Sequence, residues 1–243
     1  MSIALLLRRA VDATLSLVYP PHCVVCNTEV EPGVHLCASC EGGVRKIEAP
    51  SCRQCSSPFE GEITGSFCCS NCVDRKFHFT ASVSCYRARG MVRDLIHRFK
   101  YDRHYYLRHQ LAIWAAEALE DERLQSPGFD ALIPVPLHPT RQREREFNQA
   151  EAIAELLGER FQKQVINALQ RIRYTDSQTM HDRAERMENL RGAFRVRHPD
   201  AVLNRHLVLV DDVFTTGSTV EECARVLMEA GAASVRALVV ARR

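Results

Sequence analysis

Long hydrophobic runs are missing from this chain of 243 residues, although 46% of its residues are hydrophobic. No stretch approaches the roughly 20 consecutive apolar residues that a membrane-spanning helix needs, so we expect no transmembrane segment. The apolar stretch at residues 3–7 is too short for a signal peptide, and it is followed by arginines rather than by a small-residue cleavage site. The sequence therefore predicts a cytoplasmic protein with ample apolar residues for a core.

The N-terminal residues 2–18 have the pattern of an amphipathic helix that Pro20 and Pro21 would stop. Its apolar face could pack on the protein itself or rest on a membrane surface as a peripheral contact. The first alternative is the more ordinary one.

An excess of charge of either sign is missing too. The formal net charge is +2, from 32 basic and 30 acidic residues. Dedicated nucleic-acid-binding proteins usually carry a basic excess, so the overall charge gives that class no support.

Large apolar residues are scarce over residues 19–80, which therefore cannot build much of a core. Cysteine is abundant there instead, with nine of the eleven cysteines before residue 73. Each Cys-x-x-Cys pair directs two sulfurs at one point, and two pairs complete the tetrahedral thiolate site that Zn²⁺ favours. The four pairs are Cys23 and Cys26, Cys37 and Cys40, Cys52 and Cys55, and Cys69 and Cys72.

These eight ligands predict two structural zinc ions, whose binding would supply folding energy. We expect the pairs to combine in sequence order, although the spacing also allows interleaved pairing. Cys68, beside Cys69, is either an alternative ligand or a spare thiol. Redox-active pairs or secreted disulfides are the other interpretations, but four pairs in tandem exceed what one redox centre needs.

The stretch at residues 207–219 has the order strand, acids, turn and helix. Residues 207–210 are apolar and β-branched, which predicts a buried parallel strand that ends at Asp211 and Asp212. A turn of small hydroxylated residues then leads into a helix over residues 220–230, ending at Gly231. The turn consists of Thr215, Thr216, Gly217, Ser218 and Thr219.

This order suits a phosphorylated sugar. The turn and the following helix offer backbone N–H groups and hydroxyls to a phosphate. The two acids have no cation beside them in the sequence, and they suit vicinal ribose hydroxyls, a hydrated Mg²⁺, or both. A ribose between a 5′-phosphate and a pyrophosphate with Mg²⁺ fits. The plainer alternative is a strand, loop and helix with solvated acids and capping threonines.

A second phosphate-handling region is predicted at residues 131–157. A buried strand over residues 131–137 precedes a basic loop at residues 138–145, and a helix follows over residues 147–157. A basic loop between a strand and a helix suits pyrophosphate, which predicts contacts from His138, Arg141 and Arg145. The alternative is a solvated charged loop.

Two further segments invite functional interpretations. Residues 171–190 are polar and poorly periodic, which is typical of a mobile lid that ends in a short helix. The side chains that this lid would fold over a charged ligand are Arg171, Arg173, Gln178, Arg183 and Arg186. Residues 99–106 mix basic and aromatic side chains, and would either hold single-stranded nucleic acid or form a loop whose Lys100 faces a ligand phosphate.

The chain resembles two known patterns. Residues 207–219 resemble the phosphoribosyl-pyrophosphate (PRPP) signature of type I phosphoribosyltransferases. Nearly the whole chain resembles the ComF family of competence proteins, which includes the GntX-type proteins. The matching positions are the four cysteine pairs, residues 99–101, 133–138, Arg145, 147–149, Gln178, Arg186, Asn189, 192–194, 209–213 and 215–217.

The resemblance implies a double zinc ribbon, a phosphoribosyltransferase fold, and a role in DNA uptake or in the use of external DNA. In one place the chain departs from the family pattern Arg-Gly-Phe-Asn-Gln, because Glu146 stands where the glycine is usual. If that glycine serves a positive φ or a close approach to the ligand, we expect Glu146 to affect the pyrophosphate contact.

We therefore predict an α/β fold with a parallel sheet whose strands begin near residues 82, 131, 165, 207 and 235. The domains would be a helix at 1–18, a zinc module at 19–80 and a phosphoribosyltransferase-like domain at 81–243. Trp114, in a helix over residues 107–124, and Cys85 would be core residues.

Two functional hypotheses follow. The first is an enzyme that transfers phosphoribose from PRPP to an acceptor that the sequence does not name. Its catalytic residues would be Asp211, Asp212 and Arg186, and its PRPP contacts would come from Lys100, His138, Arg141, Arg145, the two acids and the turn at 215–219. The second is a non-catalytic PRPP-binding accessory protein that holds single-stranded DNA or a protein of the uptake machinery.

Overall fold

The computed structural model describes residues 21–61, 63, 65–175 and 183–243, without the side chains of Arg183, Ala184 and Arg186. The predicted N-terminal helix, Gln178 and the side chains predicted for Arg183 and Arg186 therefore lie outside the described residues. The chain divides into two compact units, Met1–Arg45 and Lys46–Arg243. The described part of the first unit contains the short helix α2, Ala38–Gly42, and the first two cysteine pairs. The predicted boundaries at residues 18 and 80 stay predictions.

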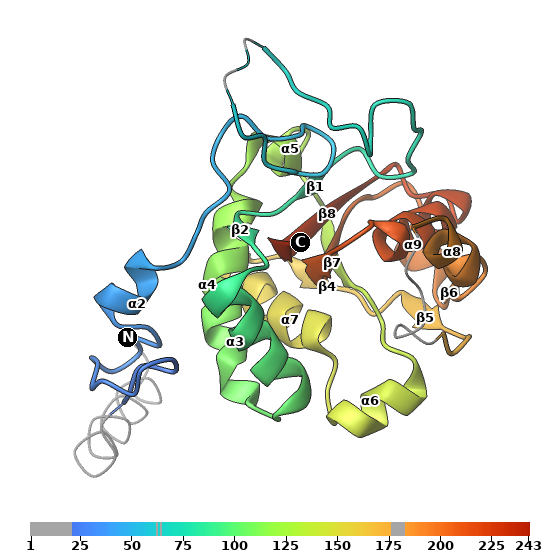
Figure 1. The fold of residues 1–243 in the computed structure, drawn as a ribbon. Coiled ribbons are helices and arrows are strands. Elements are labelled where there is room, and N and C mark those ends of the chain that lie inside the picture. Colours follow the sequence, from blue (N-terminus) through green and yellow to red (C-terminus); the bar gives the residue numbers. More distant parts are fainter. Residues whose placement is uncertain (1–20, 62, 64, 176–182) are drawn as a thin grey trace. The chain divides into compact units, whose positions relative to one another are not determined.

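The second unit is built on a parallel sheet with the strand order β1-β8-β7-β3-β4, and β2 also pairs with β8 (Figure 1). The prediction of an α/β fold is confirmed, with a strand at each of the five predicted places. The strands are β1 (Ser82–Val83), β2 (Tyr86–Arg87), β3 (Ala131–Pro134), β4 (Gln164–Val165), β7 (His206–Phe214) and β8 (Ser234–Arg242).

Helices cover both faces of this sheet, which explains why β3, β7 and β8 read as continuous apolar runs (Figure 1). The helices α3, α4 and α7 lie on one side, and α9 with α8 on the other. Their bounds are α3 (Gly90–Tyr101), α4 (Arg108–Leu119), α7 (Gln149–Phe161), α8 (Arg183–Leu190) and α9 (Ser218–Glu229).

The predicted helix over residues 107–124 is wrong as a single element. It consists of the 3₁₀ turn η1 (Tyr105–Leu107), α4, and the short helix α5 (Glu122–Gln125). The Asp121 carboxylate accepts a hydrogen bond from the backbone N–H of Arg123, and this cap starts a new helix after α4 has ended. Trp114 is buried in α4 against Tyr86, as predicted for a core residue.

A small antiparallel pair stands apart from the main sheet. It joins β5 (Leu169–Arg171) to β6 (Phe194–Val196), with α8 between them in the chain. The predicted strand at 165–169 is therefore two strands that belong to different sheets. Of the helices that the structure describes, none is long and apolar enough to cross a bilayer.

Candidate functional site

The paired acids lie within β7 rather than after it. The predicted end at Val210 is wrong, because β7 stays paired with β8 as far as Phe214. What ends at Val210 is the other neighbour: β3 pairs with β7 only up to Pro134 opposite Val210. Asp211 and Asp212 therefore follow the point where β7 loses β3, at the carboxyl edge of the sheet where α/β folds bind their ligands.

A lysine from a distant helix lies beside these acids. Lys100 Nζ in α3 donates to Asp212 Oδ1 at 2.7 Å, and both side chains are largely buried. The sequence places no cation there, since 112 positions separate the two residues. Lys100 was predicted to face a ligand phosphate from a loop. It lies in a helix instead, and in this structure it neutralises Asp212.

Asp211, the other acid of the pair, forms no ion pair with any residue that the structure describes. Its Oδ1 accepts the backbone N–H of Asp212 at 2.8 Å, and its side chain is half-buried. Burial and the neighbouring Asp212 carboxylate raise the pKa of Asp211 to about 7, although Lys100 and Arg171 act in the opposite direction. Near neutral pH this carboxyl is poised between its two charge states, so a cation or hydroxyl donor would favour the ionised form.

The turn after β7 is shaped by one glycine. Gly217 has a φ of +80°, and a Cβ there would lie 2.4 Å from the Phe214 ring. It is the N-cap of α9 and has no side chain to cap the helix, but the Ser218 N–H donates to Thr216 Oγ1 at 3.4 Å. The next N–H groups of α9 have no side-chain acceptor within this described turn and can bind an anion. Thr216 Oγ1 and the buried Ser218 Oγ lie 2.9 Å apart.

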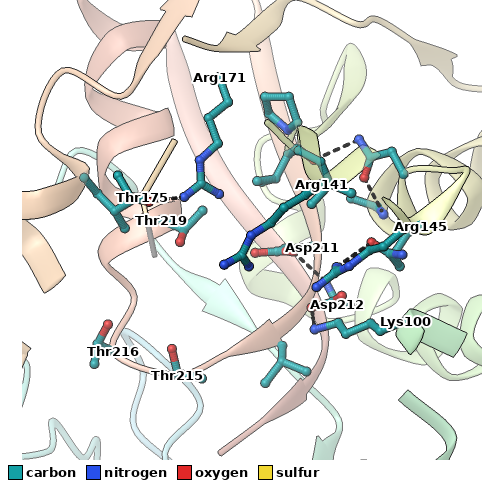
Figure 2. Close-up of a pocket in the computed structure, with 18 of the residues that line it drawn as sticks. Lys100, Arg141, Arg145, Arg171, Thr175, Asp211, Asp212, Thr215, Thr216 and Thr219 are labelled. Atoms are coloured by element: carbon teal, nitrogen blue, oxygen red, sulfur yellow. Dashed lines mark hydrogen bonds and ion pairs between the residues drawn. The ribbon is translucent and has the colours of Figure 1, made fainter. Parts of the chain in front are cut away.

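A cleft of about 410 Å³ opens over the acids and the turn (Figure 2). Among the described residues that line it, cations outnumber acids: four arginines and a lysine line it together with Asp211 and Asp212. The residues that line the cleft and that the sequence predicted are Lys100, Arg141, Arg145, Asp211, Asp212, Thr215, Thr216 and Thr219. His138, Gly217 and Ser218 are not among the described residues that line it.

Arg171 also lines the cleft. The sequence predicted it only as one of the lid side chains that would fold over a charged ligand. It ends β5, donates to the Thr175 hydroxyl, and lies 5.4 Å from the centroid of the Phe194 ring. Burial and the nearby Arg141 lower the pKa of Arg171 from its ordinary value. Two mutually repelling arginines in one cleft predict an anionic ligand with more than one charge. The available signal was that Arg171 is the first basic residue after a predicted strand.

Both cysteine tetrads form, in the sequential pairing that was expected. The sulfurs of Cys23, Cys26, Cys37 and Cys40 lie within 4.8 Å of one another, as do those of Cys52, Cys55, Cys69 and Cys72. Tetrahedral zinc with Zn–S bonds of about 2.3 Å sets its sulfurs about 3.8 Å apart. Cys26 and Cys37 are separated by 3.6 Å, and Cys55 and Cys69 by 3.7 Å. The donor sets therefore fit two structural zinc sites, and Cys68 belongs to neither.

We expect the purified protein to contain close to two zinc ions per chain, because each tetrad offers four thiolates and no open position. Elemental analysis measures this directly. Cys26→Ser should lower the zinc content by about one ion. A preparation with no zinc and with disulfides between the paired cysteines would contradict the expectation.

Comparison with known proteins supports both predicted regions, the zinc ribbon and the phosphoribosyltransferase domain. The model of the double zinc ribbon domain matches residues 14–73, and that of the phosphoribosyl transferase domain matches residues 151–243. A DNA utilization protein, YhgH of Shigella flexneri, is 32% identical over 90% of this chain and 96% of its own. The chain belongs to the ComF family.

More distant relatives extend the comparison. Competence protein F of Haemophilus influenzae is 28% identical over 85% of this chain and 90% of its own. A glutamine PRPP amidotransferase from B. subtilis aligns with 56% of this chain and 26% of its own at 20% identity. Its TM-score of 0.38 is too low to support an inference.

The segment predicted as a basic loop is a helix in this ComF protein. It forms α6, Pro139–Arg145, whose first turn is capped where His138 Nδ1 accepts the Thr140 N–H at 3.3 Å. The cap explains why the His138 ring does not line the cleft. Arg145, at the other end of α6, donates to Gln149 Oε1 at 2.9 Å and to the Tyr101 hydroxyl at 3.3 Å. These contacts hold its guanidinium in the cleft.

Glu146 ends α6 in the left-handed conformation, with a φ of 70°. A glycine adopts this conformation without steric cost, which explains the usual family residue at this position. Glu146 instead takes up the strain, and its exposed carboxylate pairs with Arg103 at 2.8 Å. The backbone thus keeps the course that the glycine would allow.

We therefore expect Glu146→Gly to raise the free energy of unfolding by about 0.5–1 kcal/mol, because relief of the left-handed strain outweighs the loss of one exposed ion pair. Urea denaturation would measure it. Glu144→Gly, inside α6, is the matched control and should lower stability by about 1 kcal/mol. Equal losses from both variants would show that residue 146 carries no strain.

Proposed function

We propose that this protein binds PRPP with Mg²⁺ in the cleft and transfers its phosphoribosyl group to a base or amine. The observation that carries the proposal is the arrangement around the end of β3: two acids, the turn at the N-terminus of α9 and several cations line one cleft. Supporting it are the phosphoribosyl transferase domain over residues 151–243 and the relatives' shared family.

Each part of PRPP has a matching chemistry. The 5′-phosphate would lie on the turn at 215–219, where the N–H groups of α9 and the threonine hydroxyls donate. Asp211 and Asp212 would accept the ribose hydroxyls and hold Mg²⁺. Arg141, Arg145 and Arg171 would bind the pyrophosphate, joined by Arg186 as the predicted lid residue.

The acids, the arginines and the turn would catalyse the transfer by positioning PRPP and by stabilising the charges that develop. As the bond from the anomeric carbon to pyrophosphate breaks, negative charge grows on the leaving group and positive charge on the ribose ring. The arginines stabilise the first, and the nearby carboxylates stabilise the second. A bound Mg²⁺ would add charge neutralisation at the pyrophosphate. The position of the acceptor amine relative to the anomeric carbon then sets the rate.

Calorimetric titration with PRPP, with and without Mg²⁺, tests the proposal. Because ligand binding would force Asp211 into its ionised form, the affinity should rise as the pH increases from 6 to 8. At pH 6.5 part of a proton should be released on binding, which titrations in buffers of different ionisation enthalpy would measure. A titration without heat at any of these pH values would overturn the proposal. Pyrophosphate release in a screen of nucleobases and amines would then identify the acceptor.

A PRPP-binding protein without turnover is the second candidate. Exposed aromatic side chains beside arginines favour it: Tyr101 and Tyr106 are 58% and 49% exposed, and Arg108 lies 4.1 Å from the Tyr105 ring centroid. Such a surface suits stacking on single-stranded DNA. This candidate predicts saturable PRPP binding without pyrophosphate release, and DNA binding that weakens steeply with salt.

The names of two relatives, DNA utilization protein and Competence protein F, support a role in competence and the use of DNA. We propose that this protein serves the same process in the cytoplasm, where reduced thiols would favour zinc over disulfides.

A further inference from the structure

The second cysteine tetrad lies directly behind the phosphate-binding turn, within the same compact unit. A small cavity of about 160 Å³ has Cys55, Cys72 and Asn71 on one wall and Thr215 and Thr216 on the other. The threonines therefore have two neighbours: the cleft on one side and the tetrad on the other. Cys52, Cys55, Cys69 and Cys72 also share one hydrophobic core with Phe214.

We propose that metal at this second tetrad positions the turn at residues 215–219, so that metal and PRPP each raise the other's affinity. The inference rests on the proposed function, because it assumes that the turn binds the 5′-phosphate. It assigns the second zinc site a role in ligand binding that a purely structural zinc site would not have.

Aromatic packing provides the first link. The ring of Phe214 occupies the space that a Cβ at residue 217 would need, so the ring packs directly against the turn. Phe79 packs edge-on against Phe214, with ring centroids 6.4 Å apart. The backbone carbonyl of Phe79 accepts a hydrogen bond from Gln54 Nε2 at 3.0 Å, and Gln54 lies between the ligands Cys52 and Cys55. A shift of this knuckle would therefore move the aromatic pair beneath the turn.

Hydrogen bonds anchor the same knuckle to the sheet. The Gln54 carbonyl accepts the Ser82 N–H of β1 at 2.8 Å, and the buried Ser56 hydroxyl donates to the Ser82 carbonyl at 3.0 Å. Further along, the Glu221 carboxylate in the first turn of α9 accepts from the His78 N–H at 3.0 Å and contacts its ring at 2.7 Å. The knuckle thus contacts β1, and the segment after the tetrad contacts the helix that follows the turn.

Charge provides a second link. A zinc ion with four thiolates has a net charge of −2, which is costly in an apolar core without compensation. Arg242, at the end of β8, is 7% exposed and lines the small cavity with Cys55, Cys72 and the two threonines. Its guanidinium lies 5.3 Å from the Phe214 ring centroid. Loss of the metal would change the charge that Arg242 faces and so disturb the wall of the turn.

Thermodynamic reciprocity gives a test in the intact protein. The zinc retained by the wild-type protein would be measured against increasing concentrations of a chromogenic chelator, with and without PRPP and Mg²⁺. For one of the two zinc ions, we expect PRPP to raise by about tenfold the chelator concentration that removes it. For the other zinc ion, this concentration should not change. Unchanged removal of both equivalents, in protein that binds PRPP by calorimetry, would overturn this inference alone. No heat with PRPP would overturn the proposed function and this inference together.

Matched variants would assign the responsive metal. Cys26→Ser removes a ligand of the first tetrad, and its remaining zinc should respond to PRPP as in the wild type. Cys72→Ser removes a ligand of the second tetrad, and its PRPP affinity should fall about tenfold while the remaining zinc no longer responds. A PRPP affinity unchanged in Cys72→Ser would contradict the inference.

Phe214→Leu covers the case in which Cys72→Ser does not fold. It leaves all eight cysteines in place but removes the ring that fits against Gly217. Full zinc content with a diminished PRPP effect on zinc removal is the expected result. A purely structural role for Phe214 would lower the unfolding temperature and leave the PRPP effect on zinc unchanged, which would overturn the link.

Discussion

Asp211→Asn is expected to abolish Mg²⁺-dependent PRPP binding and to stabilise the ligand-free protein at pH 8. The asparagine keeps the oxygen that accepts the Asp212 N–H but removes a carboxylate whose pKa is raised to about 7. A carboxyl whose folded-state pKa lies above its unfolded value of 3.8 contributes stability below pH 3.8, and this contribution is lost as the pH rises through 7. Above pH 7 the wild-type protein therefore lacks that stabilising contribution.

The size of the effect follows from the shift and from the partial exposure of the side chain. We expect Asp211→Asn to add about 1–2 kcal/mol at pH 8, or several degrees in the unfolding temperature, and to add little at pH 4. Scanning calorimetry at the two pH values would measure the difference. An equal shift at both would show that ionisation of Asp211 is not its cause.

Asp212→Asn is the matched variant, and its stability should change in the opposite direction. Asp212 is the partner of Lys100, whose side chain is only 18% exposed, so the substitution leaves a largely buried ammonium without its ion pair. A loss of about 1–3 kcal/mol is expected. PRPP binding should also weaken in this variant, and its zinc content should stay at the wild-type value. Similar stability changes in the two variants, or PRPP affinity unaltered in either, would contradict the roles assigned to this pair.

Arg236→Met is expected to cause the largest loss of stability, about 3–5 kcal/mol. Arg236 lies in β8 with 1% of its surface exposed. Its guanidinium donates to the carbonyl oxygens of Leu124, Pro127 and Gly128 at 2.7–2.8 Å. Methionine preserves much of the volume but leaves these carbonyls without their donor in a site closed to water.

Urea denaturation would measure this loss, with Arg93→Met as the control. Arg93 pairs with Asp94 on the exposed surface of α3, and its loss should cost less than about 1 kcal/mol. Equal shifts of the two denaturation midpoints would contradict the assignment. The segment whose carbonyls accept from Arg236 comes directly before β3 in the chain. Arg236→Met should therefore also weaken the packing of β3, the strand that ends beside Asp211 and Asp212.

At residue 146 the backbone conformation could be predicted, but the contacts of the side chain could not. The resemblance to the family identified Glu146 as unusual and gave a positive φ or a close approach to the ligand as the reasons that a glycine would matter. Only the structure gives the value of 70° and the ion pair to Arg103. A local pattern indicates what backbone a position requires, whereas the neighbours that compensate for a strained residue come from elsewhere in the chain.

The sequence by itself determined the features whose parts lie close together in the chain. Cysteine pairs with two residues between them form metal-binding knuckles, and an apolar strand, two acids and a hydroxylated turn follow one another within 13 residues. Alternating strands and helices also dictated a parallel sheet with helices on both faces. In each case backbone geometry connects neighbouring positions directly.

The tertiary structure alone decided what surrounds those features. Strand pairing set the position of the site. The last residue of β3 pairs with Val210, and β7 continues for four more residues, to Phe214. Helix packing brought Lys100 to Asp212 across 112 positions, and the pairing of β5 with β6 accompanies the position of Arg171 in the same cleft. Two cysteines of the second tetrad line one small cavity with Thr215 and Thr216 for the same reason. Contacts between distant segments depend on burial and packing of the whole unit, which no short pattern encodes.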